Sequence, residues 1–323
     1  MELTSDHKTV PKEILLYLSP RLREIIEIQS EAFFCKLEEI RVRYGQPLLI
    51  RCGDEDWTVK PSGQATRDIH LGYRVNEEDI YRTIASISDN SLYAFEEDIR
   101  RGFITIPGGH RVGLAGSVIA EGDEVKNMKY FSGICFRVAR QIPGAASGIF
   151  KEMCDAGNGD LVNTLIISPP RCGKTTILRD LALQISSGKG RAPENVVLVD
   201  ERSELAGCFR GVPQLNVGPQ TDVLDACPKA VGMMMAIRSL SPRVIICDEI
   251  GRQEDYIAVQ ECINAGVKVI CSVHAGSDDE LRRRPFIKDL LGGGAFKLGI
   301  VLSRSRGPGS IREIIRWEEH DRA

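Results

Sequence analysis

The chain has 323 residues, of which 42% are hydrophobic, and a formal net charge of −3 at pH 7. This length suggests about two domains, and the hydrophobic content is sufficient for two buried cores. The slightly negative charge argues against a broad basic surface for nucleic acid. The ten cysteines include no C-x-x-C pair, which argues against a zinc site or a disulfide framework and fits a reducing cytoplasm.

The opening residues, MELTSDHKTV, lack the apolar core of a signal peptide. No apolar run approaches the ~18 residues that a membrane-spanning helix needs. We therefore expect a cytoplasmic protein without a membrane span of its own, which reaches a membrane only through partners.

The first half of the chain mixes helical and strand-like patterns. A helix is predicted over residues 11–36, and Asn76 is predicted to cap a second helix that ends near Ser88. These elements predict a mixed α/β domain over residues 1–150, followed by a hinge at residues 151–160, where two glycines and an asparagine occur. The other elements predicted in this domain are a helix over 92–101 and strands over 39–44, 48–51, 103–106, 111–119 and 134–139.

Strands alternate with helices in residues 161–323. This alternation predicts a second α/β domain with a largely parallel sheet and helical crossovers. The three methionines at 233–235 are predicted to pack in its core, because Met fills irregular gaps, and the charged tail from Ile311 is predicted to be exposed. The apolar strands of this domain are predicted at 163–168, 196–200, 244–248 and 267–273.

The strongest motif joins the first of these strands to the helix that follows it. Its Gly173-Lys174-Thr175 core closely matches the phosphate-binding pattern G-x-x-x-x-G-K-[ST]. In such a loop, backbone N–H groups and the positive end of the helix attract a polyphosphate. Lys174 is expected to reach the outer phosphates, and the Thr175 hydroxyl to hold Mg²⁺. The predicted ATP-binding residues are Ser168, Pro169, Pro170, Arg171, Cys172, Gly173, Lys174, Thr175 and Thr176.

Two residues of this loop carry separate expectations. Ser168 stands where the pattern has its first glycine, which accepts a positive φ at low cost, so we expect a different entry into the loop. Cys172 lies where Lys174 and the helix N-terminus favour a thiolate. We therefore expect alkylating reagents to attack Cys172 and MgATP to protect it.

Acidic residues follow two of the predicted strands. One strand ends in Asp248 and is followed by Glu249, the order of an acid that positions Mg²⁺ and an acid that polarises the attacking water. Another strand delivers Glu201 and Glu204 to the same sheet edge, where ligands of open α/β sheets bind. The catalytic base is predicted to be Glu249 or an acid of the 200–204 segment.

His274 ends the strand at 267–273 and is followed by Ala275-Gly276. Two interpretations are open: the imidazole is structural, or it senses the γ-phosphate and couples it to a neighbour. The three arginines at 282–284 are most simply interpreted as a solvated helical face.

The order of these motifs resembles the secretion and pilus motor ATPases of the RecA-like class. The chain departs from many of them in having Asp248-Glu249 where they have Gly-Glu, so its metal handling is expected to be closer to that of generic RecA-like enzymes. Several stretches, which together span most of the chain, are more particularly similar to the stage III sporulation protein AA family: EIRVRYGQPLLI (39–50), SLYAFEEDIRRGFITIPGGHRVGLAG (91–116), FRVARQIPGAA (136–146), SPPRCGKTTILRD (168–180), VVLVDERSELAG (196–207) and VIICDEIG (244–251).

This resemblance implies an N-terminal α/β domain followed by a RecA-like P-loop ATPase domain, assembled as a homo-hexameric ring. It implies a mother-cell ATPase of endospore-forming bacteria that serves a channel of membrane proteins around the forespore. In related motors, arginines of the first domain reach the bound nucleotide. The resemblance extends that catalytic role to Arg111, Arg137 and Arg140, which the sequence places at strand starts and ends.

Taken together, the residues predict an Mg²⁺-dependent ATPase. A nucleic-acid-dependent ATPase is one alternative, against which the net charge of −3 and the lack of a basic, aromatic-rich stripe argue. A small-molecule kinase is a second alternative. A third is a scaffold that binds ATP without turning it over.

Overall fold

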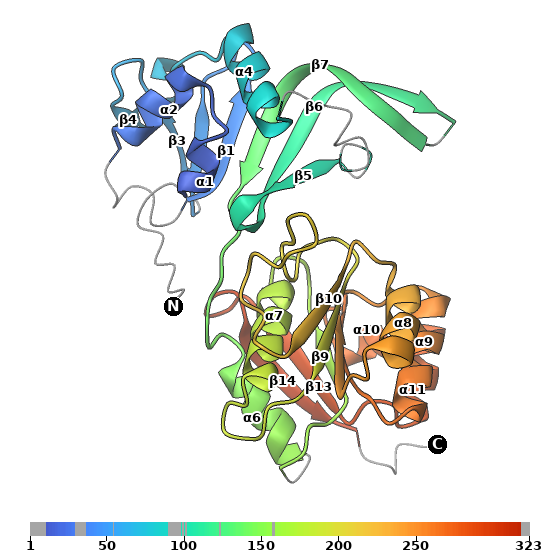
Figure 1. Cartoon of the computed structure of the whole chain (residues 1–323). Helices are drawn as coiled ribbons and strands as arrows, with labels where there is room; N and C mark the ends of the chain where they lie inside the picture. Colours follow the sequence, from blue (N-terminus) through green and yellow to red (C-terminus); the bar gives the residue numbers. More distant parts are fainter. Residues whose placement is uncertain are drawn as a thin grey trace. The chain divides into compact units, whose positions relative to one another are not determined.

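The structure is a computed structural model that describes residues 11–29, 37–53, 55–89, 98, 100, 102–122, 124–156 and 159–317. The chain divides into two compact units, Met1–Arg140 and Gln141–Ala323 (Figure 1). This division falls before residue 150, where the sequence placed the end of the first domain. Most of the described part of the expected hinge at 151–160 belongs to a helix of the second unit, α6 (Ser147–Ala156), whose Phe150 and Met153 are buried.

The first unit is built on a sheet in which each neighbouring pair of strands is antiparallel. Among the described residues, its strands in spatial order are β4 (Ala65–Thr66), β3 (Glu55–Val59), β2 (Leu49–Cys52), β1 (Leu37–Arg43), β7 (Glu124–Arg137), β6 (His110–Glu121) and β5 (Phe103–Ile106). Two short 3-10 turns are present: η1 (Ile69–Leu71) follows β4, and η3 (Pro107–Gly109) joins β5 to β6.

Helices α1 (Lys12–Leu15), α2 (Pro20–Glu27) and α4 (Glu77–Ile87) share one apolar core with this sheet. The single helix predicted over 11–36 was wrong, because a new helix starts at Pro20 with Ser19 as its N-cap. The Ser19 side chain accepts a hydrogen bond from the Leu22 N–H, and proline occupies the first helical position. Residues 30–36 lie outside the described part of the chain.

The helix predicted after Asn76 is confirmed. The Asn76 side chain accepts from the Asp79 N–H, and the Asp79 carboxylate accepts from the Asn76 N–H, so each residue satisfies a donor of the first turn. The strand predicted at 103–106 coincides with β5. Strand β7 begins well before the predicted residue 134, because its polar first half is held by pairing with β6. The helix predicted over 92–101 lies mostly outside the described residues.

The second unit contains a largely parallel sheet, as predicted. Its order within the described residues is β10 (Thr221–Asp225), β9 (Val196–Asp200), β11 (Val244–Cys247), β12 (Lys268–Val273), β8 (Thr164–Ile167), β13 (Leu298–Ser303) and β14 (Ser310–Arg316). Neighbouring strands are parallel except for β13 and β14, which form an antiparallel hairpin. Parallel pairing brings the carboxyl ends of β8, β9, β11 and β12 to one edge.

Helices cover both faces of this sheet (Figure 1). On one face, α6 and α7 (Lys174–Ser186) pack against alternate strand residues such as Ile166 and Ile246. The other face, which includes Leu165 and Ile245, is covered by α8 (Lys229–Ser239), α9 (Gln253–Asn264), α10 (Asp278–Arg282) and α11 (Pro285–Gly292). Because β8, β9, β11 and β12 are buried on both sides, they appear in the sequence as continuous apolar runs.

The end of the described chain differs from expectation. Residues from Ile311, predicted to be an exposed tail, form β14, and Trp317 is buried directly after it. A Cβ at Gly299 would lie 2.5 Å from the Trp317 ring, so the glycine on β13 makes room for the indole. Of the three methionines, Met233 is buried as predicted, whereas Met235 is exposed.

Candidate functional site

The phosphate-loop motif adopts the strand-loop-helix arrangement that the sequence predicts. Strand β8 ends at Ile167, and α7 begins at Lys174 after Gly173, whose φ is 88°. Only glycine adopts this conformation without strain. The loop is supported from the β13–β14 hairpin, where the Gly309 N–H donates to the Cys172 carbonyl at 2.8 Å. A Cβ at Gly173 would lie 3.2 Å from the Gly309 nitrogen, so the two backbones are in close contact.

The serine at the first glycine position is explained by the local backbone. Ser168 is buried, its N–H donates to the Val273 carbonyl at 3.1 Å, and it is not among the residues with positive φ. The positive φ in the loop entry belongs instead to Arg171, at 61°. A glycine is therefore not required at position 168.

Cys172 does not have the environment that its sequence position suggested. Its side chain is buried and belongs to the apolar core between α7 and the sheet, with the sulfur 3.7 Å from the Pro170 carbonyl oxygen. Reactive thiols are partly exposed, so the expected alkylation of Cys172 is not supported by this placement.

Three residues from three separate segments meet around the Glu249 carboxylate. Lys174 Nζ lies 3.5 Å from Glu249 Oε1, and His274 Nε2 lies 2.6 Å from the same oxygen. Arg202 Nη1 lies 3.0 Å from the other oxygen, Oε2. Lys174 also approaches the imidazole of His274 at 3.2 Å. The phosphate loop, the acid after β11 and the histidine after β12 thus form one cluster.

The backbone of Glu249 is strained, with φ at 50°. A non-glycine residue in this region costs of order 1 kcal/mol and persists where the surroundings hold it in place. Here the Glu249 N–H donates to Ser272 Oγ at 2.9 Å, and the side chain has the three partners described above. The strain therefore coincides with the candidate base of the site.

Asp248 lies beside Thr175 at the start of α7. Its Oδ2 accepts a hydrogen bond from Thr175 Oγ1 at 3.2 Å, and its Oδ1 accepts one from Ser272. Burial raises the pKa of the Asp248 carboxyl above its ordinary value. A hydroxyl and a carboxylate at a phosphate loop fit the oxygen ligands that Mg²⁺ prefers. No group of three or more His, Cys, Asp or Glu side chains suited to a metal occurs in the described residues, so water and phosphate oxygens would complete such a site.

The acidic segment after β9 is a tight loop built around Asp200. Asp200 is buried, and its carboxylate accepts hydrogen bonds from the N–H groups of Glu204, Leu205 and Ala206 at 2.8, 2.9 and 2.9 Å. From the other side, Arg179 of α7 donates to the Leu205 and Glu204 carbonyls. Burial lowers the pKa of Arg179 to about 10. The loop is thus held to the helix that follows the phosphate loop.

Replacing Asp200 is expected to destabilise the second unit. Asp200→Ala leaves three N–H groups without their acceptor, two of them in buried bonds, and should lower the free energy of unfolding by roughly 3 kcal/mol. Chemical denaturation would measure the loss. Asp222→Ala, at an exposed aspartate on the neighbouring strand β10, is the matched control. Equal stability of the two variants would contradict this assignment.

The two glutamates of this loop have partners other than Lys174. Glu201 forms an ion pair with Lys229, a buried lysine at the start of α8. The backbone of Glu204 is fixed by Asp200 and Arg179. Both glutamates line a pocket. Its other lining residues are Asp200, Arg202, Lys229, Asp248 and Glu249. Both glutamates therefore lie at the site, but the contacts place Glu249 next to the phosphate-binding lysine.

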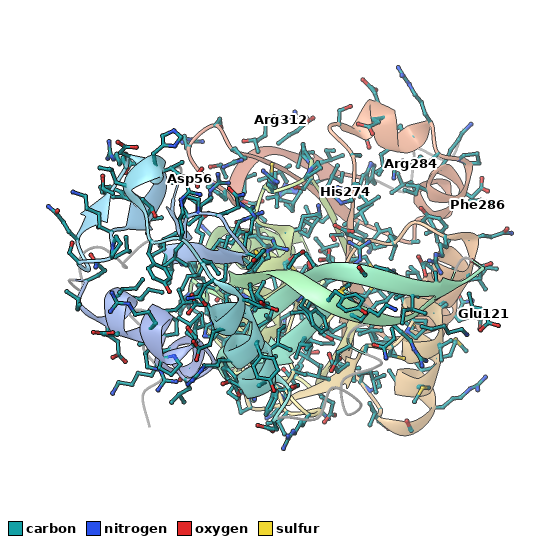
Figure 2. The ribbon with its side chains drawn as sticks, turned by 90° about the horizontal axis from the view of Figure 1, so that it is seen from above. Asp56, Glu121, His274, Arg284, Phe286 and Arg312 are labelled. Carbon is teal, nitrogen blue, oxygen red and sulfur yellow. The ribbon has the colours of Figure 1, made fainter. Side chains whose placement is uncertain are left out.

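The segment after His274 is anchored by arginines. Arg284 donates to the His274 carbonyl, and Arg312 of β14 donates to the Gly276 carbonyl at 2.7 Å. Figure 2 labels His274, Arg284 and Arg312. The prediction that the arginines at 282–284 form only a solvated helical face was therefore wrong for Arg284. Its role is to fix the backbone that presents His274.

The three predicted arginines of the first unit lie at one end of its sheet. Arg137 of β7 is paired in register with Arg111 of β6 on one side and with Glu39 of β1 on the other. The Arg111 guanidinium lies 4.0 Å from the centre of the Phe103 ring. Arg140 donates to the Leu37 carbonyl at 2.5 Å. Their action on a nucleotide stays a prediction.

Three features of the site were missed in the sequence. Arg202 and Lys229 each pair with a glutamate on another element, and Ser272 contacts both Asp248 and the Glu249 backbone. Arg202 lies in the 196–207 stretch but carried no prediction of its own, whereas Lys229 and Ser272 lie outside the quoted stretches. Only the fold brings these three residues to the site. The one local signal for Lys229 was a lysine directly after Pro228, followed by the apolar stretch AVGMMMAI.

The chain is similar in structure to solved secretion ATPases over most of its length. The pilus retraction motor PilT with bound ADP gives a TM-score of 0.59 at 14% identity, covering 93% of this chain and 83% of that one. The ATPase DotB of Legionella pneumophila gives 0.57 at 14% identity, covering 87% of this chain and 75% of that one. Because these matches extend over most of the chain, the fold is that of the RecA-like secretion ATPases, an N-terminal α/β domain followed by a P-loop domain.

A closer relationship is found in sequence. The model of the family "Sporulation stage III, protein AA" matches residues 8–321. Stage III sporulation protein AA of Bacillus subtilis (strain 168) is 42% identical over 304 residues, which are 94% of each chain. The chain belongs to the stage III sporulation protein AA family.

Proposed function

We propose that this chain is an Mg²⁺-dependent ATPase that couples hydrolysis to the assembly or operation of a secretion-like channel during endospore formation. The observation that carries the proposal is the meeting of Lys174, Glu249 and His274 beside the Thr175–Asp248 pair. These residues come from three strand ends, and each has the chemistry that phosphoryl transfer to water requires.

Each residue has a defined part in the proposed reaction. The backbone N–H groups of the phosphate loop and Lys174 bind the β- and γ-phosphates. Thr175 and Asp248 hold Mg²⁺, which neutralises charge on the phosphate oxygens. Glu249 accepts a proton from water as the water oxygen bonds to the γ-phosphorus and the bond to the β–γ bridging oxygen breaks, leaving ADP and phosphate. His274 contacts both Lys174 and Glu249, which favours the proposal that it couples the γ-phosphate to the base.

Additional cations are proposed to come from the first unit. Phosphoryl transfer benefits from positive charge near the γ-phosphate, and the described nucleotide cluster contains Lys174 and Arg202. Arg111, Arg137 and Arg140 are proposed to approach the nucleotide when it binds, within one subunit or across a homo-hexameric ring. The sequence resemblance to secretion and pilus motors supports this part of the proposal.

The cellular setting follows from the family. Stage III sporulation protein AA is the name of the relative in Bacillus subtilis, and we place this chain at the mother-cell side of a sporulation channel, with membrane proteins as its partners. No helix in the described residues is long and apolar enough to cross a membrane. The net charge of −3 makes nucleic acid an improbable partner.

The proposal is tested by measuring phosphate release together with mass in solution, in the presence of ATP and Mg²⁺. Turnover by a hexamer is the expected result. Binding of ATP without phosphate release would favour the scaffold, and stimulation by nucleic acid would favour the nucleic-acid-dependent ATPase. Transfer of phosphate to a metabolite by a monomer or dimer would favour the kinase.

A further inference from the structure

Arg202 lies at the candidate site, but the sequence predicted roles only for the acids of its segment and none for the arginine. It follows β9 in the loop built around Asp200, and its side chain is 66% exposed. An exposed arginine of this kind is ordinarily a solvated surface group, and an isolated ion pair there contributes little stability. Its partner, however, is Glu249, the acid proposed to activate water, at 3.0 Å.

The contacts of Glu249 are divided between its two oxygens. Oε1 faces Lys174 at 3.5 Å and His274 at 2.6 Å, whereas Oε2 faces Arg202. Bound phosphates would attract Lys174, since its ammonium is the cation of the phosphate loop. Arg202 comes from a different loop, so its contact with Oε2 does not depend on the position of Lys174. One oxygen is therefore held while the other is directed at the phosphate site.

The backbone that carries Arg202 is fixed from two sides. Asp200 accepts three N–H bonds from the residues after it, and Arg179 of α7 donates to two carbonyls of the same loop. Ser203, the next residue, is buried and has φ at 53°, which a tightly constrained turn sustains. A side chain attached to such a fixed backbone can orient a neighbouring side chain, because its own Cα does not move.

We propose that Arg202 is the positioning residue for Glu249. Arg202 holds Oε2 so that Oε1 faces the water that attacks the γ-phosphate. This role rests on the proposed ATPase function and adds a residue outside the phosphate loop, the β11 acids and His274. The loop after β9 thereby contributes to hydrolysis through an arginine, while Glu201 of the same loop is held by Lys229.

The test uses the full chain with Arg202→Ala and Arg202→Lys. Arg202→Ala should lower kcat about tenfold, the scale of a misplaced catalytic group, with KM for ATP and the affinity for ATP unchanged. Arg202→Lys, which keeps a charge, should recover part of kcat. The matched control is Arg243→Ala, an exposed arginine paired with Glu194 at 4.0 Å just before β11, at the other end of that strand, and its kcat should equal that of the unchanged chain.

A double variant separates positioning from other roles. If Arg202 acts through Glu249, then the double variant Arg202→Ala/Glu249→Gln should be no slower than Glu249→Gln alone. Once the Glu249 carboxylate is gone, Arg202 has no base to position, so its removal costs nothing further. Additive losses would overturn the inference. So would weaker ATP binding in Arg202→Ala, since that result would place the guanidinium on the phosphates.

The failure of this inference is distinguishable from the failure of the proposed function. If the unchanged chain hydrolyses ATP and Arg202→Ala matches Arg243→Ala, only the role of Arg202 is overturned. If the unchanged chain releases no phosphate in any assembly state, both the ATPase function and the role of Arg202 are overturned.

Discussion

Lys174→Ala is expected to abolish hydrolysis and to weaken ATP binding roughly 100-fold, which corresponds to the loss of about 3 kcal/mol from charged hydrogen bonds. Lys174 is 5% exposed and contacts both Glu249 and His274. The other described cation that contacts Glu249, Arg202, lies outside the phosphate loop and so does not replace Lys174 there. A fluorescent ATP analogue, titrated in the presence of Mg²⁺, would measure the loss of affinity.

The control for this variant is Lys268→Ala. Lys268 is exposed at the first position of β12, at the opposite end of the strand that leads to His274. The Lys268→Ala variant should bind ATP with the same affinity as the unchanged chain. We expect the Lys174→Ala variant to fold, because Glu249 keeps Arg202 and His274 as partners when the Lys174 side chain is removed. Thermal unfolding of both variants would check this. Unchanged affinity in a folded Lys174→Ala would contradict the nucleotide site itself.

Glu249→Gln is expected to retain ATP binding and to slow hydrolysis by at least ~100-fold, the usual scale for loss of a general base. Glutamine keeps the shape of the side chain and can still accept hydrogen bonds at one oxygen, but it cannot take the proton from water. Phosphate release in a single turnover, with enzyme in excess over ATP, would measure the chemical step apart from product release.

The other acids of the site provide the comparison. Glu201→Gln and Glu204→Gln should slow the reaction less, because Glu201 is paired with Lys229 and neither acid contacts Lys174 through a described bond. If Glu201→Gln or Glu204→Gln stops turnover while Glu249→Gln does not, the base lies in the loop after β9. That outcome would move the assignment without changing the class of enzyme.

Much of the second unit could be predicted from the sequence, for a physical reason. Strands β8, β9, β11 and β12 are buried on both faces, so their apolar runs are long and unbroken. Strand β10, with the sequence TDVLD, is only partly buried at the sheet edge and has no such run. The charged residues of β14, Arg312, Glu313 and Arg316, are exposed, and this made a strand look like a tail.

The site was predictable where one motif supplies the chemistry and unpredictable where two distant elements share it. The residues within Gly173-Lys174-Thr175 follow one another in sequence, and so do Asp248 and Glu249. Each of the two motifs can therefore be recognised from the sequence alone. The pairing of Arg202 with Glu249 depends on β9 and β11 being neighbours. Local sequence also gave the wrong environment for Cys172, because the direction in which a loop side chain points is decided by packing.

The position of β8 in the interior of its sheet has a consequence for the order in which the chain folds. Its two neighbours, β12 and β13, are both far ahead in the sequence, and Asn163 beside β8 accepts a hydrogen bond from Val269, 106 residues later. The last support of the phosphate loop, Gly309, comes later still. Contacts so distant along the chain close slowly. On the ribosome, the nucleotide site is therefore completed only after nearly all of the second unit has been synthesised. A shorter nascent chain already contains Lys174 and Glu249, but they are not yet arranged as in the finished site.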